Sequence, residues 1–574
     1  MIRINSRLTE LLVRVFLICW AFGNALPIAA QTPAGSRTTY NADFQALYEA
    51  PATGTAAFVR AWVLREVSHV PITTYVQDAA LPDLCFFDSK IGEVFGDRFG
   101  DNLASINPPI ERTLASSLRV LRGERTDVLR LVTAALKPRG VEVLAGVRMS
   151  DTHHRRIAWD EGLCPRFTID HPEWVIRQPD GRTNETALDY SHPGVREHRL
   201  AIMRELATAY DIDGLELNFI RWGKHFPRDE GAAKAPIMTE FIGQVRAMLD
   251  EAARGRGRKH LVLGVRVPEG IRECWLAGLD PETWVRRGWI DYLVASPFNE
   301  TSPQVRVEEF RRFTLGRAQL LASMGDMIGG TWTGLPRVSG RGLAQFSDSY
   351  GGMLMTPPEA RAAASNFYAW GAEGIAFWNV GTKMGLSLGR WSPDQAAAQH
   401  ERLWAWMNAA VDRKNLDRAE RHYHYLPLHK WGADPAPPRR NYAWYGSGQS
   451  PLGTLSTQIL HFPNSVIGMR QPYRFRMADG RNGEPVDATV RFKMLHLGAD
   501  GAVEIDLNGR PVPAANIHRS PLDPDKLGLP GTQFELTLAR WSHFRGDNIL
   551  GVILQKQTAG AAVPYLEELE AIVP

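Results

Sequence analysis

The length and composition of the chain already exclude several classes of protein. With 574 residues it is too long for one ordinary domain, and 44% hydrophobic and 22% charged residues are typical of a folded chain rather than a disordered one. The 66 basic and 63 acidic residues leave a net charge of +3, far from the basic excess of a dedicated nucleic-acid-binding protein, so no nucleic-acid partner is expected. Tryptophan is frequent, at 17 residues.

The N-terminus has the pattern of a secretory signal peptide. Arg3 and Arg7 precede an apolar stretch over 11–26, which Arg14 interrupts, and small residues follow at 29–30. This order predicts a signal peptide over residues 1–30, with cleavage and export to the periplasm or the exterior. The alternative is a membrane anchor, but the stretch is short for a span of about 20 residues. No stable membrane insertion is therefore expected after cleavage.

Residues 36–415 alternate between short β-branched runs and amphipathic helical stretches. Eight runs predict strands, at 37–43, 72–76, 141–147, 212–219, 261–265, 290–295, 319–323 and 374–378. Strands that alternate with helices indicate parallel βαβ units. Eight such units predict an α/β fold, a (β/α)8 TIM barrel with long loops. No GxGxxG motif follows an early strand, so a dinucleotide-binding sheet is disfavoured and no cofactor is expected.

Beyond residue 415 the helical periodicity ends. Pro-rich and Gly-rich segments predict a linker over 416–448, and residues 449–574 carry alternating runs at 473–477, 488–492, 503–507, 534–538 and 549–554. The Asn508-Gly509 pair predicts a tight hairpin turn. This pattern predicts a C-terminal all-β sandwich of the jelly-roll type. Its segments 504–511 and 545–549 resemble the galactose-binding jelly-roll domains attached to extracellular glycosidases.

The cysteines leave their pairing open. Cys85, Cys164 and Cys274 remain after signal cleavage, and none of them lies in a CxxC or CxxxH motif. One disulfide with a free thiol and three buried thiols are both compatible with the sequence. A structural zinc site built on cysteine is not expected, and no metal is predicted.

Polar residues follow almost every predicted barrel strand. Catalytic groups of such barrels lie at the C-terminal ends of the strands and in the loops that follow. The density of these groups predicts a polar substrate held by many hydrogen bonds, and the interleaved Trp side chains suit stacking on sugar rings. The residues predicted to bind substrate are Asp43, Arg148, Asp151, His153, His154, Asn218, Arg221, Trp222, Arg266, Asn299, Glu300, Trp378 and Asn379.

The most informative motif is the fourth strand of the predicted barrel. Strand alternation places Gly214, Glu216 and Asn218 on one face and the apolar residues between them on the other. The apolar face would contact the helices, which leaves Glu216 and Asn218 pointing into the barrel. A buried carboxylate is costly unless it is paired or used in chemistry. The structural alternative is an ion pair between Glu216 and Arg148 or Arg266.

Three segments carry a resemblance to a known group of families. Residues 188–196, 210–219 and 280–292 resemble the uncharacterised glycosyl-hydrolase-like barrels that are related to the alpha-amylase superfamily. The resemblance implies a (β/α)8 barrel that acts on a carbohydrate. One departure matters, because Asn218 stands where the amylase-like pattern has its nucleophilic Asp, and Glu216 stands where amylases keep an Arg. Either Glu216 has taken a catalytic role, or the chemistry differs, or the site only binds.

Hydrolysis of a glycosidic bond needs two carboxyls on either side of it. They lie about 5–5.5 Å apart in retaining enzymes and about 6.5–9.5 Å apart in inverting ones. We predict Glu216 and Glu269 as this catalytic pair, because the ends of adjacent strands bring side chains within that range. Glu300, Asp151 and Asp326 are competitors for the second role. Adjacent histidines such as His153 and His154 are a weak metal signal, since neighbours in an extended chain point apart.

Two other functions remain open from the sequence. A polysaccharide lyase acting on uronic acids would use an Arg beside a His or Tyr base, and Arg148, Arg221 and Arg266 with the paired histidines offer such groups. A carbohydrate-binding barrel without catalysis is the third possibility, suggested by Asn218 at the nucleophile position. No GxSxG motif is present, which disfavours an esterase.

Overall fold

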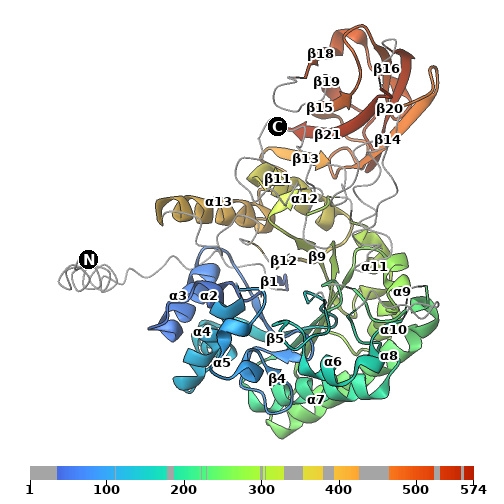
Figure 1. Cartoon of the computed structure of the whole chain (residues 1–574). Helices are drawn as coiled ribbons and strands as arrows, with labels where there is room; N and C mark the ends of the chain where they lie inside the picture. The colour runs from blue at the N-terminus through green and yellow to red at the C-terminus, as the bar shows by residue number, and fades with distance from the viewer. Residues whose placement is uncertain are drawn as a thin grey trace, which may run out of the picture.

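The computed structural model describes most of the chain. The described residues are 35–109, 111–154, 156–177, 186–221, 223–227, 229–297, 301–303, 305–328, 353–378, 380, 393–425, 464–522, 531–557 and 562–574. They form two domains, an α/β domain followed by an all-β domain (Figure 1).

The first domain is a closed barrel of eight parallel strands. Its strands are β1 (Thr38–Ala42), β2 (Thr74–Ala80), β5 (Glu142–Arg148), β6 (Gly214–Asn218), β7 (Val262–Pro268), β8 (Tyr292–Ser296), β9 (Gln319–Met324) and β12 (Gly374–Trp378). Each strand pairs in parallel with its neighbour, and β1 pairs with both β12 and β2, which closes the ring. The predicted (β/α)8 barrel is confirmed, and all eight predicted runs are barrel strands.

Helices surround this barrel on the outside (Figure 1). They are α2 (Gln45–Glu49), α3 (Thr55–Ser68), α4 (Glu111–Gly123), α5 (Val128–Leu136), α6 (Arg166–Asp170), α7 (Pro193–Ala209), α8 (Gly231–Gly255), α9 (Ile271–Leu276), α10 (Pro281–Arg286), α11 (Val307–Thr314), α12 (Pro357–Ala369) and α13 (Pro393–Val411). Short strands β3 (Leu84–Cys85), β4 (Glu93–Val94), β10 (Met327–Ile328) and β11 (Met353–Leu354) lie in the loops. Leu215 and Leu217 of β6 belong to the same buried apolar core as Phe241 and Val245 of α8, so the apolar face of β6 contacts the helices as predicted.

The opposite face of β6 lies inside the barrel between two glycines. Gly146, Glu216 and Gly264 stand in register on three adjacent strands. A Cβ atom at Gly146 would lie 2.5 Å from Oδ1 of Asp78, and one at Gly264 would lie 2.0 Å from Cζ of Tyr292. The glycines therefore leave the space that these two side chains occupy beside Glu216.

The second domain is a sandwich of two antiparallel sheets. One sheet has the order β13 (Arg421–Tyr425), β21 (Tyr565–Val573), β15 (Val486–Leu495), β19 (Gly531–Trp541) and β18 (Ile517–Pro521). The other has the order β14 (Arg470–Arg476), β20 (Asp547–Lys556), β16 (Ala502–Leu507) and β17 (Arg510–Pro511). The predicted all-β sandwich is confirmed. Asn508 and Gly509 have φ values of 54° and 78°, the left-handed backbone that the predicted turn between β16 and β17 requires.

The predicted linker over 416–448 is wrong at its beginning. Residues 421–425 form β13, which pairs along its whole length with β21, the last strand of the chain. The alternation of His and Tyr in this short run is a strand pattern, but its partner lies far away in the sequence. The rest of that predicted linker, residues 426–448, lies outside the described residues.

Buried polar contacts join the two domains. Arg476 of the sandwich binds Glu308 of α11 at 2.8 Å and Asp547 of its own sheet at 2.8 Å. Asn366 of α12 donates its amide to the carbonyl of Arg476 at 3.0 Å. The guanidinium of Arg476 also lies over the ring of Trp370, 4.3 Å from its centroid. The sandwich is thus fixed to the helices that follow β8 and precede β12.

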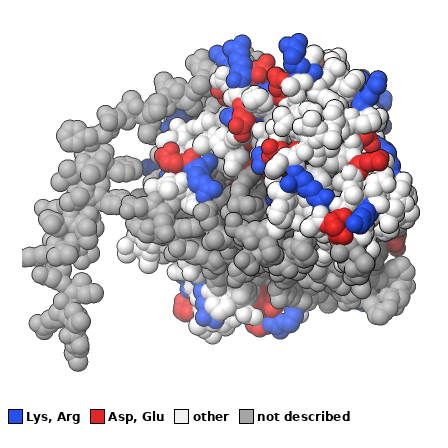
Figure 2. Space-filling model, turned by 90° about the horizontal axis from the view of Figure 1, so that it is seen from above, with Lys and Arg blue, Asp and Glu red and all other residues white. Residues whose placement is uncertain are grey.

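Three further features concern the cysteines, the surface charge and the possibility of a membrane-spanning helix. Cys85, Cys164 and Cys274 are buried free thiols, and burial raises the pKa of each thiol, so the described cysteines contain no disulfide. On the face seen in Figure 2, basic and acidic side chains are interspersed. No helix within the described residues is both long and apolar enough to cross a membrane.

The glycine row gives a test of the barrel interior. We expect Gly264→Ala to lower the free energy of unfolding by about 1–3 kcal/mol or more, because the new methyl group would overlap the buried Tyr292 ring. Gly255→Ala, at the exposed end of α8 with no neighbouring atom within 4 Å, is the matched control and should change stability by less than about 1 kcal/mol. Denaturant unfolding of both variants measures the difference, and equal stabilities would contradict this packing.

Candidate active site

Arg148 is the central cation at the mouth of the barrel. It lies at the end of β5 and is 2% exposed. Its guanidinium contacts three carboxylates: Asp43 at 2.7 Å, Asp78 at 2.9 Å and Asp151 at 3.1 Å. These acids come from the end of β1, from β2 and from the loop after β5. The structure thus brings together Asp43, Arg148 and Asp151, which the sequence predicted, and adds Asp78, which it did not.

The three acids differ in how readily they hold a proton. Burial raises the pKa of Asp78 to about 6, even though Arg148 opposes this shift. Burial also acts on Asp43 and Asp151. For Asp43 the nearby Arg148 and Arg221 outweigh burial, and for Asp151 the contacts with His153 and Arg148 do, so the pKa of each lies below its ordinary value. Asp78 is therefore the member of this group that protonates first.

Glu216 lies inside the barrel, fully buried, as predicted. Its Oε2 accepts a hydrogen bond from the Tyr292 hydroxyl at 2.7 Å. Its Oε1 accepts from Nδ2 of Asn41 at 3.3 Å and from Nε of Arg266 at 3.4 Å. The ion pair with Arg266 that the sequence left open as the structural alternative is present.

Asn41 links Glu216 to a second carboxyl. Its Nδ2 lies 3.3 Å from Oδ1 of Asp78 and 3.3 Å from Oε1 of Glu216. The two carboxylate oxygens can therefore be no more than twice that distance apart, about 6.6 Å. This upper limit keeps the pair below the largest separation used by glycoside hydrolases, about 9.5 Å. Glu269, the partner predicted from sequence, is buried directly after β7.

Arg266 contacts the next two barrel strands as well as Glu216. Its Nη1 donates to the hydroxyls of Ser296 at 3.2 Å and Ser323 at 2.7 Å. Its guanidinium lies over the Trp378 ring, 5.3 Å from the centroid. Trp378 is only 2% exposed, so in this structure its ring packs on Arg266 instead of presenting an open face.

His153 and His154 occupy different environments, as expected for adjacent residues in an extended chain. Nδ1 of His153 lies 2.6 Å from Asp151, and its Nε2 lies 2.6 Å from Nη2 of Arg221. A guanidinium only donates, so Nε2 accepts from Arg221 and the Nδ1–H group donates to Asp151. Burial lowers the pKa of His153 and that of His154, the latter to about 4, which favours neutral rings.

Asn218 has a local structural role. Its Oδ1 accepts hydrogen bonds from the backbone N–H groups of Ile220 at 3.0 Å and Arg221 at 3.1 Å. These bonds form a turn at the end of β6, because an Asn side chain can accept from the backbone two or three residues further on. The turn places Arg221 beside His153.

Glu111 is an acid at the mouth that sequence analysis missed. It is the first residue of α4 and accepts a hydrogen bond from the Tyr48 hydroxyl at 2.7 Å. Burial raises the pKa of Glu111 to about 7, and charge repulsion from Asp43 and Asp151 adds to the shift. A carboxyl that titrates near neutral pH beside an ionised group is suited to proton transfer.

Sequence analysis missed Asp78 and Glu111 for different reasons. The second strand was predicted to end at residue 76 but continues to Ala80, and its alternation carries Asp78 to the inner face. Glu111 had no local signal, since Tyr48 and the acids near it come from distant segments. The predicted site residues Trp222, Asn299, Glu300 and Asn379 lie outside the described residues.

Comparisons with known proteins find similarity of structure only. No protein-family model matches the chain, and no curated protein matches it. Among solved structures, alpha-L-fucosidase isoenzyme 2 from Paenibacillus thiaminolyticus has a TM-score of 0.39 at 13% identity, over 67% of this chain and 51% of that one, so the match spans about half of its length.

Two further solved structures are similar at the same level. The PgaB (BpsB) glycoside hydrolase domain from Bordetella bronchiseptica has a TM-score of 0.36 at 13% identity, over 63% of this chain and 98% of that one. An alpha-amylase from Geobacillus thermoleovorans has 0.35 at 12%, over 92% and 100%. At these TM-scores the similarity identifies neither a family nor a substrate.

The pKa of Glu111 predicts a pH-dependent stability. Its carboxyl has an ordinary value of 4.5 and a value of about 7 in the folded protein, so over this window the folded state keeps a proton that the unfolded chain releases. The wild type therefore loses stability as the pH rises through the window. Glu111→Gln mimics the protonated acid and does not titrate, so its stability relative to wild type should rise by up to about 3 kcal/mol from acid to neutral pH.

Thermal unfolding of wild type and Glu111→Gln across this pH range measures the effect. Glu124→Gln, an exposed change just beyond the end of the same helix, is the control and should follow the wild type at every pH. A constant difference between Glu111→Gln and wild type would show that Glu111 does not titrate in this window.

Proposed function

We propose that the chain is an exported glycoside hydrolase that cleaves a glycosidic bond in an oligo- or polysaccharide. The observation that supports this most directly is the position of Asp78 and Glu216 on either side of the Asn41 amide, no more than about 6.6 Å apart. Asp78 lies in the C-terminal half of β2 and Glu216 at the middle of β6, one turn of the pleat below the strand ends where enzymes of this fold carry their catalytic groups.

The two carboxyls suit different roles. Asp78 has a raised pKa of about 6, so near neutral pH it still holds a proton in part of the molecules and is the general acid of the proposal. Glu216 accepts bonds from Tyr292, Asn41 and Arg266, which orient it as the nucleophile or base. Glu269, buried at the end of the adjacent strand, remains the alternative second carboxyl.

The groups around this pair suit a carbohydrate substrate. Asp43, Asp151, His153 and Arg221 offer donors and acceptors near Arg148, and sugar hydroxyls need both. Trp275 of α9, in the segment that follows β7, is 40% exposed and presents an apolar face of the kind that stacks on sugar rings. The proposal also includes substrate binding by the remaining residues for which the sequence predicts that role.

A polysaccharide lyase is the second candidate, and one observation favours it. His153 is held by Asp151 and has a lowered pKa, so its ring is neutral near pH 7. Its basic nitrogen is Nε2, which accepts from Arg221 in this structure and would act as the base once Arg221 turns to the substrate. Arg221 lies beside it and would neutralise a uronate carboxylate. A lyase leaves a double bond in its product that absorbs in the ultraviolet, whereas a hydrolase does not.

Two isosteric variants test the paired-carboxyl mechanism. On a substrate found by screening a panel of polysaccharides for released reducing ends, Asp78→Asn and Glu216→Gln should each lower kcat by about 100-fold or more, because each removes one acid–base group. Both should still bind the glycan. Glu66→Gln is the matched control, since Glu66 bonds to Tyr40 and Tyr75 in the barrel wall and its change should leave kcat within about threefold.

The outcomes of this experiment separate the candidate functions. Full activity of both variants would exclude the Asp78–Glu216 pair. Full activity of Asp78→Asn together with an inactive Glu216→Gln would leave Glu269 for the second role. A product that absorbs in the ultraviolet, lost on His153→Ala, would identify a lyase. Glycan binding without turnover by the wild type on any substrate would identify a binding barrel.

Export is proposed from the N-terminal sequence. In a bacterial host we expect the full chain to reach the periplasm or medium with a new N-terminus close to Gln31, because the charged, apolar and small-residue regions are read by the secretion machinery. Cell fractionation and N-terminal sequencing measure this, with a chain that lacks residues 2–26 as the control that stays in the cytoplasm. An uncleaved chain beginning at Met1 would contradict the proposal.

A further inference from the structure

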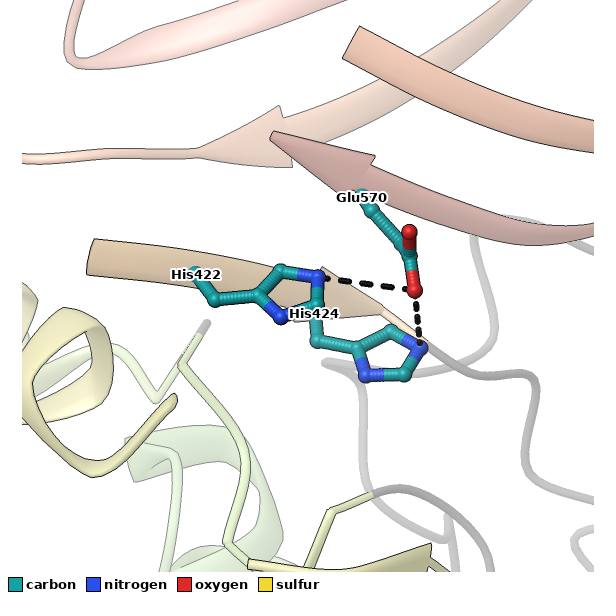
Figure 3. Close-up of side chains that lie close together, drawn as sticks. All are labelled: His422, His424 and Glu570. Atoms are coloured by element: carbon teal, nitrogen blue, oxygen red, sulfur yellow. Dashed lines mark ion pairs between the residues drawn. The ribbon is translucent and has the colours of Figure 1, made fainter. Parts of the chain in front are cut away.

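Two histidines and two glutamates share one face of the β13–β21 strand pair. His422 and His424 are two residues apart on β13, so they lie on the same face of the strand. His424 stands directly opposite Glu570 of β21, and Glu568 is two residues away from Glu570. Figure 3 shows both imidazoles turned toward the Glu570 carboxylate.

The spacing of the ligand atoms is close to that of a tetrahedral metal site. Oε1 of Glu570 lies 3.4 Å from Nε2 of His422 and 3.5 Å from Nε2 of His424, and the three atoms all lie within 4.8 Å of one another. When a metal–ligand distance is about 2.0–2.1 Å, two ligands of a tetrahedron are about 3.3 Å apart. Two of the three edges therefore have the required length, and the third, between the two imidazole nitrogens, is no longer than 4.8 Å.

The other oxygen of each glutamate is occupied by a cation. Oε2 of Glu570 lies 3.4 Å from Arg491, and Oε2 of Glu568 binds Lys493. Oε1 of Glu568 instead faces Nε2 of His424 at 2.5 Å. Both carboxylates are thus oriented with one oxygen toward the imidazoles. The 2.5 Å contact is a hydrogen-bond distance and is shorter than the edge of a ligand tetrahedron, so Glu568 becomes a fourth ligand only when its oxygen moves away from Nε2 of His424.

A third carboxylate orients His424 from the other domain. Nδ1 of His424 lies 2.7 Å from Oε1 of Glu359 on α12. The other oxygen of Glu359 accepts hydrogen bonds from Thr356 at the start of that helix. A histidine that binds a metal through one ring nitrogen almost always donates from the other to a carboxylate or carbonyl, and Glu359 supplies this acceptor.

We propose that His422, His424 and Glu570, with Glu568 as the fourth ligand, form a Zn²⁺ site between the barrel and the sandwich. Imidazole nitrogens with carboxylate oxygens suit zinc, and four protein ligands without an open position are typical of a structural site. Because Glu359 of the barrel holds a ligand of the sandwich, zinc in this position stabilises the contact between the two domains. The alternative occupant is a proton on His424, shared with Glu359 and Glu568.

Zinc binding by the intact chain tests the proposal without any activity assay. The full protein, purified without a histidine tag and treated with a chelator, should bind one Zn²⁺ per chain in calorimetric titration with the metal alone. Its thermal midpoint should rise by several degrees, because a ligand that binds only the folded state stabilises it.

Variants that keep most of the interface locate the metal. His422→Ala leaves the contacts of His424 with Glu359 and Glu568 in place, and Glu570→Gln keeps the size of the side chain. Each should weaken Zn²⁺ binding by at least about 10-fold and abolish the thermal shift. His518→Ala changes an exposed histidine of the same domain and should bind zinc like the wild type.

Two results would overturn the proposal. One is the absence of stoichiometric zinc binding by the wild type, which would leave the proton as the occupant. The other is unchanged zinc binding by both His422→Ala and Glu570→Gln, which would place the metal elsewhere. Neither result bears on the Asp78–Glu216 mechanism, because that pair lies inside the barrel and is tested by turnover.

Discussion

A carboxylate buried inside the barrel must accept hydrogen bonds from neighbouring strands, and the rest of the structure depends on this constraint. Glu216 is fully buried, and an unpaired acid in that position would destabilise the fold by several kcal/mol. Tyr292, Asn41 and Arg266 supply the three hydrogen bonds it needs, from strands β8, β1 and β7. A carboxylate on one strand thus ties together four strands of the ring.

The glycines beside Glu216 follow from the same constraint. Tyr292 reaches the carboxylate because its ring lies where a side chain at position 264 would stand, and Asp78 approaches because position 146 is also glycine. Barrel interiors are usually filled by branched apolar side chains, and here Val76, Leu144 and Leu321 form such a layer. Polar groups, among them Arg148 and its three acids, replace that packing toward the mouth.

Three acids at the mouth share one cation, and their pKa values differ as a result. Arg148 faces Asp43, Asp78 and Asp151, and one guanidinium does not neutralise three carboxylates. The acid with the greatest burial and the fewest additional cations, Asp78, has the raised pKa. The same electrostatics raises the pKa of Glu111 at the edge of this group. Two acids that titrate near neutral pH beside ionised ones are the arrangement that acid–base catalysis requires.

The sequence by itself determined the eight barrel strands, the sandwich, the inward face of β6 and most of the residues around Arg148, because strand alternation and strand ends are local properties. The tertiary structure alone decided which groups meet. Asn41 lies 175 residues from Glu216, and only the closure of β1 onto β2 and β12 places its amide between Asp78 and Glu216. In the same way β13 finds its partner at the end of the chain, and the histidines of that strand meet Glu570 only after the sandwich has formed. Local periodicity carries no information about such contacts, since they depend on the register and closure of sheets whose strands are far apart in the sequence.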